Sequence, residues 1–380
     1  MPNDANTVPG GPLSGVRILE FAGVGPVQFA GMMFDDMGAD VIRIDRPSPS
    51  SLLELDYDIL DRGRRSITVD LKTTAGVATV LRICETSDAL IEGYRPGVME
   101  RLGLGPGVIA SRNPRLVFGR ATGWGQYGPL AAAAGHDINY IAISGALHAI
   151  GEESNPVIPL NLIGDFGGGG MMLAFGVLSA LFEAKHSQLG QVVDAAMTDG
   201  AATLLASIYS LHACGKWSTR RRSNLLDGGS PVYGAYACAD DRWISIGPLE
   251  LKFYHLLLGK LGLPVERFPD PGDRLAWPAL KEALRSIFRQ RTRQQWCEVL
   301  EGSDVCFAPV LNFEEAPLHP HNVARSTFIT RDDVQQPAPC PRLSRTPGAV
   351  RRSPARPGVH TVEGLQELGF SPAEIALLSG

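Results

Sequence analysis

Residues 16–45 decide the fold, and they read VRILEFAGVGPVQFAGMMFDDMGADVIRID. Residues 16–21, which are mostly apolar, predict a strand, and residues 22–26 form a glycine-rich turn. Residues 27–38 have the apolar spacing of a helix that ends at a glycine, and residues 40–45 predict a second strand. A strand–helix–strand unit of this length predicts parallel strands in a sheet covered by helices on both faces.

The same alternation of strands and helices continues beyond this unit. Residues 166–185 are rich in Gly, Ala, Met and Leu and carry scarcely a charge before Glu183, which predicts a buried helix. Further strands are predicted at 66–71, 89–92, 116–121 and 191–197, and further helices at 73–86, 98–102 and 198–213. The pattern therefore predicts a large, Rossmann-like α/β domain.

The pattern changes near Lys216, where the chain becomes basic and loop-like. Residues 233–247 alternate in polarity and predict a hairpin. Amphipathic helices are then expected at 250–261, 277–289 and 292–300. We therefore predict a large domain over residues 1–215, completed by residues 330–380 returning to it, and a smaller α+β domain over residues 225–318.

The composition limits the classes of function. A net charge of −5 over 380 residues gives no general attraction to nucleic acid or anionic membranes, so a polyanionic ligand needs a local arginine cluster. Six scattered cysteines without a CxxC pair argue against a metal centre or disulfides. The longest apolar run, 171–182, is too short to span a bilayer, and neither end of the chain resembles a targeting signal. We expect a cytoplasmic protein without membrane, nucleic-acid or metal partners.

Two polar positions in glycine-rich surroundings suggest proton transfer. Residues 135–140 read GHDINY and set His136 beside Asp137, while residues 164–170 read GDFGGGG and place Asp165 before a glycine run. An imidazole and a carboxylate on opposite sides of a carbon acid can remove a proton from one face and return it to the other. Taken singly, His136 is more often structural and Asp165 more often a helix cap, but their pairing favours racemisation or epimerisation.

Two glycine patterns invite a dinucleotide-binding interpretation, and both are incomplete. Residues 123–128 match G-x-G-x-x-G, but Pro129 follows and no acidic residue lies about 20 positions on, so a rigid loop is the better interpretation. Gly23 and Gly25 lie between a strand and a helix, but Gln28 replaces the third glycine of the fingerprint. Neither pattern predicts a nucleotide cofactor.

Cationic side chains follow the ends of several predicted strands. Arg46, Lys72 and Arg95 each come just after a strand, and Arg101 follows in the next helix. Ligands of open α/β sheets bind at the carboxyl ends of the strands, and arginine binds phosphate in bidentate fashion. Surface solubility explains any one of these residues about as well, but the set favours a phosphorylated ligand.

Short motifs over about residues 13–327 match a known family. Glu20 with Gly25-Pro26, and the segments 38–47, 70–72, 92–97 and 101–103, resemble the family III CoA-transferase superfamily. The segments 122–126, 135–140, 161–169 and 226–229 resemble its α-methylacyl-CoA racemase branch. The resemblance implies an isomerase that inverts the α-carbon of 2-methylacyl-CoA thioesters by two-base 1,1-proton transfer through an enolate. CoA is then part of the substrate, and no cofactor is required.

The resemblance also assigns roles to residues. His136 and Asp165 correspond to the two bases, and the backbone N–H near Asp137 corresponds to the group that receives the thioester oxygen as it gains negative charge. Glu250 matches a residue that hydrogen-bonds the catalytic histidine and fixes its tautomer. The expected CoA- and substrate-binding positions, whose arginines contact the CoA phosphates, are Arg46, Val69, Asp70, Leu71, Lys72, Gly93, Tyr94, Arg95, Arg101, Gly135, Ile138, Asn139 and Tyr140.

The assembly implied by the resemblance is an interlocked ring homodimer. The site then lies between the large domain of one chain and the small domain of its partner, so Glu250 would come from the partner chain. Met171, Met172 and Met197 are candidates for an apolar surface under the acyl chain, although core packing explains each of them equally well. The sequence does not determine the acyl group.

Two alternatives stay open at this point. A family III CoA-transferase would use Asp137 as the nucleophile of a covalent intermediate, but the position of His136 is usually occupied by a non-basic side chain in those enzymes. A non-enzymatic CoA- or nucleotide-binding protein is supported only by the arginines. The histidine therefore favours proton transfer.

Overall fold

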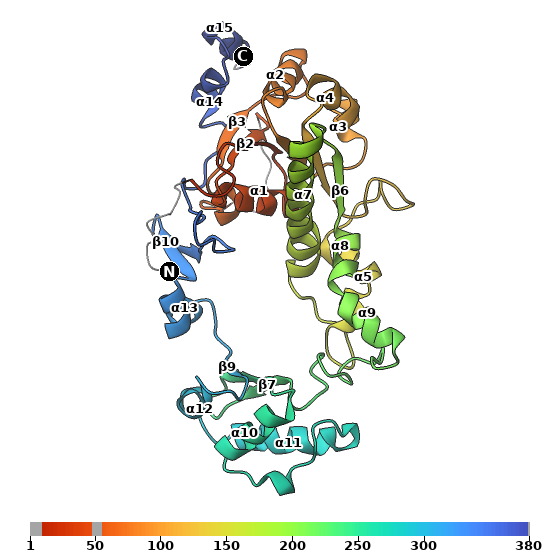
Figure 1. Cartoon of the computed structure of the whole chain (residues 1–380), viewed down its shortest axis with the longest axis vertical. Coiled ribbons are helices and arrows are strands. Elements are labelled where there is room, and N and C mark those ends of the chain that lie inside the picture. The colour runs from red at the N-terminus through yellow and green to blue at the C-terminus, as the bar shows by residue number, and fades with distance from the viewer. Residues whose placement is uncertain (1–9, 48–54, 379–380) are drawn as a thin grey trace. The chain divides into compact units, whose positions relative to one another are not determined.

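The structure is a computed structural model that describes residues 10–47 and 55–378 (Figure 1). These residues form two compact units. The first contains the described residues up to Ser144, Pro159–Leu205 and those from Phe328 onward, and the second contains Gly145–Ile158 and Ala206–Thr327.

The units differ from the predicted domain ranges at two segments. Residues 145–158 and helix α9 (Ala206–Ala213), both expected in the large domain, group with the second unit. Arginines hold the first segment there, because Arg221 Nε donates to the carbonyl oxygen of Glu152 at 2.7 Å and Arg222 pairs with the Glu152 carboxylate at 3.0 Å. Helix α9 has no buried residue that would anchor it in the core of the first unit.

The first unit is built on a six-stranded parallel sheet, which confirms the predicted α/β class. The strand order is β3-β2-β1-β4-β5-β6. The strands are β1 (Arg17–Phe21), β2 (Asp40–Asp45), β3 (Arg65–Thr68), β4 (Ala89–Glu92), β5 (Val117–Thr122) and β6 (Val192–Ala196). Because β2 and β3 lie on one side of β1 and β4 to β6 on the other, the order reverses between β1 and β4. Ligands of such sheets bind beyond the carboxyl ends of the strands at this point.

Helices cover both faces of this sheet. Ile18 and its neighbours face α1 and α7, which lie side by side in Figure 1, whereas Leu19 faces α2, α4 and the carboxyl-terminal α14. Successive strand residues point to opposite faces, so one short strand contributes to two apolar cores. The helices of this unit are α1 (Pro26–Asp36), η1 (Ile59–Asp61), α2 (Thr74–Cys84), α3 (Val98–Arg101), α4 (Pro106–Arg112), α5 (Asp137–Ile143), η2 (Leu162–Met171), α7 (Met172–Ser187), α8 (Met197–Leu204), α14 (Thr361–Glu367) and α15 (Pro372–Leu378).

The glycine-rich helix begins earlier than predicted and is buried on one face only. The π-helix η2 runs directly into α7, giving one continuous helix, Leu162–Ser187. Among the described residues it is the one helix that is long and apolar enough to cross a membrane. However, η2 packs against α1 and α8 as the core helix of a globular domain does. On its outer face Phe175 and Phe182 are 71% and 68% exposed. A fully buried helix is therefore wrong for this segment, because apolar side chains occupy its outer face as well.

The second unit is a small antiparallel sheet with helices. The predicted hairpin is confirmed, because β7 (Gly234–Ala237) pairs with β8 (Trp243–Ile246) and Asp241 adopts a φ of 56° between them. The third strand, β9 (Phe307–Pro309), is too short to show a period in the sequence. The helices are α6 (Ala146–Ala149), α9, α10 (Leu251–Lys260), η3 (Val265–Arg267), η4 (Arg274–Ala276), α11 (Trp277–Phe288), α12 (Arg293–Leu300), η5 (Ala316–Leu318) and α13 (Pro320–Arg325).

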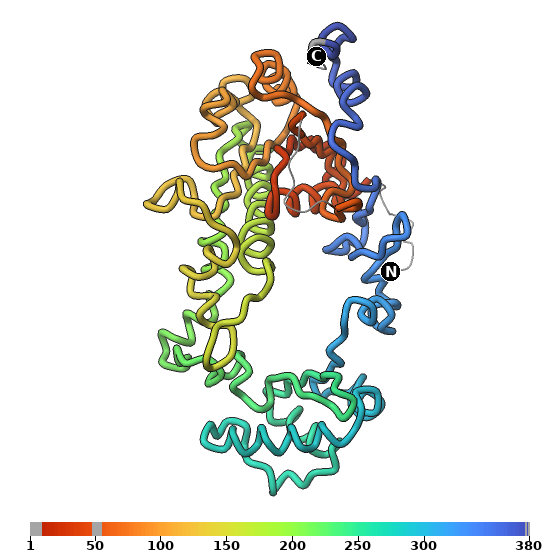
Figure 2. The backbone as a smooth tube through the Cα atoms, turned by 180° about the vertical axis from the view of Figure 1, so that it is seen from behind, coloured from red at the N-terminus to blue at the C-terminus, as the bar shows by residue number. Residues whose placement is uncertain are grey.

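The chain then returns to the first unit. A hairpin of β10 (Phe328–Arg331) and β11 (Val334–Pro337) leads into a stretch rich in Pro and Arg, residues 337–357. There Arg351 Nη1 donates to the carbonyl oxygen of Gly38 at 3.1 Å, and further on Leu365 enters the apolar core behind β1. Figure 2 shows this returning segment, in blue, running along the amino-terminal part of the unit, in red. Residues 337–357 therefore contact the first unit, and they also connect the β10–β11 hairpin to α14.

A layer of charged side chains is buried between the sheet and α1. Glu20 of β1 is fully buried, and its nearest cation is Arg64, whose Nη1 lies 3.4 Å from Glu20 Oε2. Neither carboxylate oxygen of Glu20 accepts a hydrogen bond from a described residue. Arg64 also pairs with Asp61 at 2.7 Å. Burial raises the pKa of Glu20 to about 7, against the opposing effect of Arg64.

Glu20 should make the stability of the fold depend on pH. A carboxyl group with a raised pKa in the folded state contributes stability below its unfolded value of 4.5, and this contribution is lost as the pH rises through about 7. Between pH 6 and pH 8 we expect the wild type to lose about 1 kcal/mol through this group, at roughly 1.4 kcal/mol per pKa unit. Glu20→Gln should lack this component. Thermal unfolding midpoints of both proteins across this range measure it, and parallel curves would contradict it.

Candidate active site

The loop after β5 ends at the start of α5 and places His136 there. His136 is the N-cap residue of α5, and its backbone N–H donates to Asn139 Oδ1 at 3.1 Å. Tyr140, one turn into the helix, donates its hydroxyl hydrogen to the carbonyl oxygen of Gly135. The His136 side chain is exposed, whereas Tyr140 is buried. The loop is thus fixed on both sides of an imidazole that is open to a ligand.

The glycine pattern at 123–128 allows close packing in this loop. A Cβ atom at Gly123 would lie 2.0 Å from the ring of Tyr140. The rings of Tyr140 and Trp124 meet edge to face, with their centroids 4.7 Å apart. This geometry agrees with the interpretation of the pattern as a rigid loop.

The second candidate base lies in the first turn of η2, held by Asp137. The backbone N–H of Asp165 donates to Asp137 Oδ1 at 2.7 Å. Gly164 makes the approach possible, because a Cβ atom there would lie 2.4 Å from the same oxygen. The helix cap predicted as the plain role of Asp165 is not found, since the N-cap position belongs to Asn161.

The Asp165 carboxyl group is half-buried among few partners. Asn161 Nδ2 donates to Asp165 Oδ2 at 3.3 Å. The turn before α1 closes the other side, because a Cβ atom at Gly25 would lie 3.3 Å from that oxygen. Burial raises the pKa of Asp165, the charge of Asp137 raises it further, and Asn161 and His136 act in the opposite direction. His136, Asp137 and Asp165 therefore share one electrostatic environment.

The glycine run explains how η2 fits between two helices. A Cβ atom at Gly168 would lie 2.7 Å from the backbone nitrogen of Ala201 in α8. One at Gly170 would lie 2.7 Å from the ring of Phe29 in α1. Phe29 in turn stacks on Phe166, with centroids 4.9 Å apart. The run thus packs the backbone of η2 directly against its neighbours and fixes the position of Asp165.

The predicted cations lie beyond the carboxyl ends of the strands. Arg46 follows β2, Arg95 follows β4, and Arg101 ends α3. All three side chains are exposed, and none forms an ion pair with another residue of the described chain. The guanidinium of Arg46 lies 5.7 Å from the ring centroid of Tyr94, within the range of a cation–π contact. Free cations at the point where the strand order reverses are suited to an anionic ligand.

The two groups of predicted residues are close in space. Burial raises the pKa of Tyr140, the charges of Asp165 and Asp137 raise it too, and Arg95 acts in the opposite direction. Arg95 therefore lies near enough to α5 to influence its side chains.

The predicted positions after β3 are of two kinds. Val69 is buried and Leu71 packs against the apolar core, so their side chains stabilise the fold. Asp70 Oδ1 accepts a hydrogen bond from the backbone N–H of Lys72 at 2.9 Å, and the Lys72 side chain is exposed. Only Lys72 offers a free charge here. In α5, Ile138 is 37% exposed beside the imidazole.

Glu250 belongs to the second unit. It occupies the N-cap position of α10, but its side chain is exposed and makes no capping hydrogen bond. Its carboxylate therefore does not cap the helix.

Metal ligands are not grouped anywhere in residues 10–47 and 55–378. No cluster of three or more His, Cys, Asp or Glu side chains is arranged there to hold a metal ion. The six cysteines, all within the described ranges, are free thiols.

Comparison with known proteins decides the family. The profile of CoA-transferase family III matches residues 13–361. The chain belongs to CoA-transferase family III. Among family III relatives, α-methylacyl-CoA racemase of Mus musculus is 44% identical over 370 residues, covering 96% of each chain. The racemase of Homo sapiens is 42% identical and covers 97% of this chain and 96% of its own.

Solved structures share the fold of this chain. Rv3272 from M. tuberculosis matches with a TM-score of 0.79 at 27% identity, covering 93% of this chain and 99% of that one. A CAIB/BAIF family protein from Brucella suis matches with a TM-score of 0.82 at 22% identity, covering 94% of this chain and 100% of that one. The fold of this family III chain is thus shared with proteins of low sequence identity.

Sequence reasoning missed three contacts of this family III site. These are the hydrogen bond from Asn161 to Asp165, the approach of Gly25 to the same carboxyl group, and the use of the Asp137 side chain as an acceptor. Gly25 was visible as part of a glycine-rich turn and of a family motif, neither of which predicts its approach to Asp165. The hydrogen bond from Asn161 spans four residues at the start of η2, and the helix was predicted to begin later than it does. The contact of Asp137 with Asp165 depends on where η2 packs, which no local pattern encodes.

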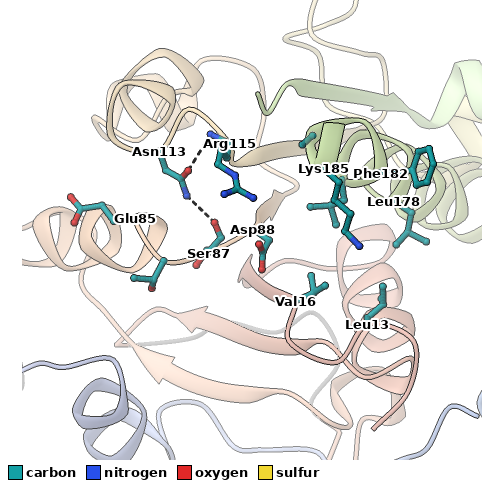
Figure 3. Close-up of a pocket in the computed structure, with 13 residues that line it drawn as sticks. Leu13, Val16, Glu85, Ser87, Asp88, Asn113, Arg115, Leu178, Phe182 and Lys185 are labelled. Carbon is teal, nitrogen blue, oxygen red and sulfur yellow. Dashed lines mark hydrogen bonds between the residues drawn. The ribbon is translucent and has the colours of Figure 1, made fainter. Parts of the chain in front are cut away.

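A cavity of about 480 Å³ lies elsewhere in this family III protein. Val16, Asp88 and Arg115, which precede β1, β4 and β5, line it at the amino-terminal ends of these strands. Figure 3 shows Asn113 in this lining, hydrogen-bonded to Ser87 and to Arg115. Lys185 and Phe182 of α7 form another wall. None of the predicted site residues lines it, so it lies at the opposite end of the strands from the candidate bases.

Proposed function

We propose that this protein is an isomerase that inverts the α-carbon of 2-methylacyl-CoA thioesters. The racemases of mouse and man, at 44% and 42% identity over nearly the whole chain, support this reaction. The observation that carries the proposal is the shared environment of the exposed His136 imidazole and the half-buried Asp165 carboxyl group. These are the two kinds of group that a 1,1-proton transfer needs.

The reaction moves one proton off the α-carbon and another onto it. One base takes the α-proton, and the electrons of the C–H bond pass into an enolate whose negative charge rests on the thioester oxygen. The conjugate acid on the other face then donates its proton to the carbon. His136 and Asp165 exchange these roles according to the enantiomer bound. The backbone N–H of Asp137, at the first position of α5, is suited to the enolate oxygen.

The CoA part of the substrate would bind at the carboxyl ends of the strands. Arg46, Arg95 and Arg101 would contact its phosphates, because they are exposed cations without ion-pair partners in the described chain. Lys72 would add a fourth charge. No cofactor or metal is invoked, because a thioester is itself a sufficiently acidic carbon acid. We further propose that the protein acts in the cytoplasm, without nucleic-acid or membrane partners.

The active form would be the interlocked homodimer. Two unpartnered surfaces support a partner chain: α9 has no buried residue, and the outer face of α7 exposes Phe175 and Phe182. A second copy of the chain would cover apolar side chains of this kind. In this assembly the partner subunit's Glu250 would accept a hydrogen bond from the imidazole of His136 and fix its tautomer.

Co-expression of two inactive chains tests whether the site is shared. His136→Ala and Glu250→Gln homodimers should both be nearly inactive. If Glu250 acts across the dimer, each mixed dimer has one intact site out of two. The purified mixed dimer should therefore show about half of the wild-type activity. The measurement is racemisation by the doubly tagged, purified mixed dimer, with separately purified variants combined after expression as the control. No recovery in the mixed dimer would place Glu250 within its own chain's site.

The alternative function, CoA transfer through Asp137, is supported only at the level of the family. The Asp137 carboxyl group is 7% exposed and one oxygen is already bonded to Asp165, which is unfavourable for a nucleophile. The deciding experiment incubates one enantiomer of a 2-methylacyl-CoA with the protein in D2O without any acceptor acid. Deuterium uptake at the α-carbon with inversion is the expected result. No uptake, with CoA transfer once a free acid is added, would assign the protein as a transferase.

A further inference from the structure

The side chain of Asp137 has an unusual environment for a carboxylate. It is 7% exposed, and Oδ1 accepts the backbone N–H of Asp165 at 2.7 Å. Oδ2 is buried and has no hydrogen-bond partner among the described residues. A buried polar atom without a partner costs about 1–3 kcal/mol, more if charged, so the fold alone gives no reason to keep a carboxylate there.

We propose that the Asp137 side chain is a positioning residue that sets the place and the proton affinity of Asp165. This inference rests on the proposed racemase function. The hydrogen bond through Oδ1 fixes the first turn of η2, where Asp165 lies. The negative charge then acts on the Asp165 carboxyl group from the buried side, and the missing side chain of Gly164 allows the two to be this close.

The charges and dipoles around Asp165 show why such a group is useful. From α5 it faces Asp137, His136 and the Tyr140 hydroxyl. From the residue before η2 it faces the Asn161 amide, and from the turn before α1 it faces Gly25. Asn161 and His136 both favour the ionised form. A base that must also return a proton needs a proton affinity close to that of its partner imidazole. Asp137 and burial counter the other two groups, which brings Asp165 toward that condition.

The contacts of Asp137 suit a positioning residue and not a nucleophile. A nucleophile needs an oxygen that reaches the thioester carbon, but one Asp137 oxygen is bonded to η2 and the other is enclosed. The same residue can support proton transfer without touching the substrate.

Two substitutions at Asp137 separate the effect of its hydrogen bond from the effect of its negative charge. Asp137→Asn retains an oxygen that accepts the Asp165 N–H but removes the negative charge, whereas Asp137→Ala removes both. A matched control is Asp194→Asn, because Asp194 also accepts a backbone hydrogen bond, from Gln126 at 3.0 Å, but does not face Asp165.

The main readout is the pH dependence of kcat/KM for α-proton exchange by the enantiomer that faces Asp165. The rising limb should move to lower pH in Asp137→Asn and stay in place in Asp194→Asn, because Asp165 then loses its proton more easily. Asp137→Ala should lose about tenfold or more in rate. An unchanged limb in Asp137→Asn, or trapping of a covalent acyl intermediate on Asp137 in the wild type, would overturn the proposal.

A second readout does not depend on the reaction. Amide hydrogen exchange in residues 162–171 of the substrate-free protein should speed up in Asp137→Ala and stay near the wild-type rate in Asp137→Asn. Equal rates in all three proteins would sink the positioning role even if racemisation is observed. If the wild type exchanges no α-proton at all, the proposed function fails, while this measurement still reports whether Asp137 holds η2.

Discussion

Alanine at His136 or at Asp165 should lower racemisation by about 10³-fold while sparing part of the isotope exchange, because a positioned acid or base contributes about 10²–10⁴-fold. With one base removed, the other still takes the α-proton of the enantiomer that it faces. It then returns a deuteron from solvent to the same face. His136→Ala should therefore exchange one enantiomer without inversion, and Asp165→Ala should exchange the other.

This reciprocal pattern is measured by following deuterium and configuration together, with each enantiomer of a 2-methylacyl-CoA in D2O. Thermal unfolding serves as the check that both variants fold. His321→Ala is a suitable control, because this exposed histidine of α13 belongs to the second unit and lies outside α9. If both variants lost exchange of the same enantiomer only, a single base would act on both faces, and the two-base mechanism would be wrong.

Gly25→Ala should reduce kcat by about 10²-fold, as a displacement of about 1 Å in a reacting group does. Two effects combine here. Gly25 has a φ of 72°, which strains a side chain, and the new Cβ atom would lie 3.3 Å from Asp165 Oδ2. The substitution therefore strains the backbone of the turn before α1 and displaces the Asp165 carboxyl group. KM for the CoA thioester should change much less, since the cations lie on other turns.

The neighbouring Gly23 provides a matched control for this substitution. It lies in the same turn, but a Cβ atom there would meet only the carbonyl oxygen of Phe21, at 3.8 Å, and its φ is not in the left-handed region. Gly23→Ala should therefore retain most of the activity. Steady-state kinetics on both variants decide the matter, and equal losses would show that the turn tolerates no side chain for reasons unrelated to Asp165.

The sequence predicted the sheet and the two candidate bases for different reasons. In strands such as 40–45, the β-branched residues Val41, Ile42 and Ile44 stand between turns, and parallel order follows from the helices between the strands. His136 and Asp165 stood out because each is a chemically active side chain among glycines. Both signals are local, so they survive without knowledge of tertiary structure.

Features that depend on packing could not be predicted in this way. The helix expected at 198–213 is interrupted at Leu205 to give α8 and α9, although no proline or glycine stands at the break. The outer face of α7 has the same residue types as its core face, so composition could not show that Phe175 is exposed. The hydrogen bond between Asp137 and Asp165 joins positions 28 residues apart, and only the placement of η2 brings them together.

The close packing of η2 has a consequence for engineering the acyl-chain preference. The backbone at Gly164, Gly168 and Gly170 already touches its neighbours, so a larger side chain at these positions would displace helices rather than reshape a pocket. Variation in substrate range must instead come from positions whose side chains face open space beside the bases. Ile138 in α5 and Leu162 at the start of η2, 37% and 56% exposed, are such positions. A mutant library aimed at new substrates should therefore vary Ile138 and Leu162 and leave the glycines of η2 unchanged.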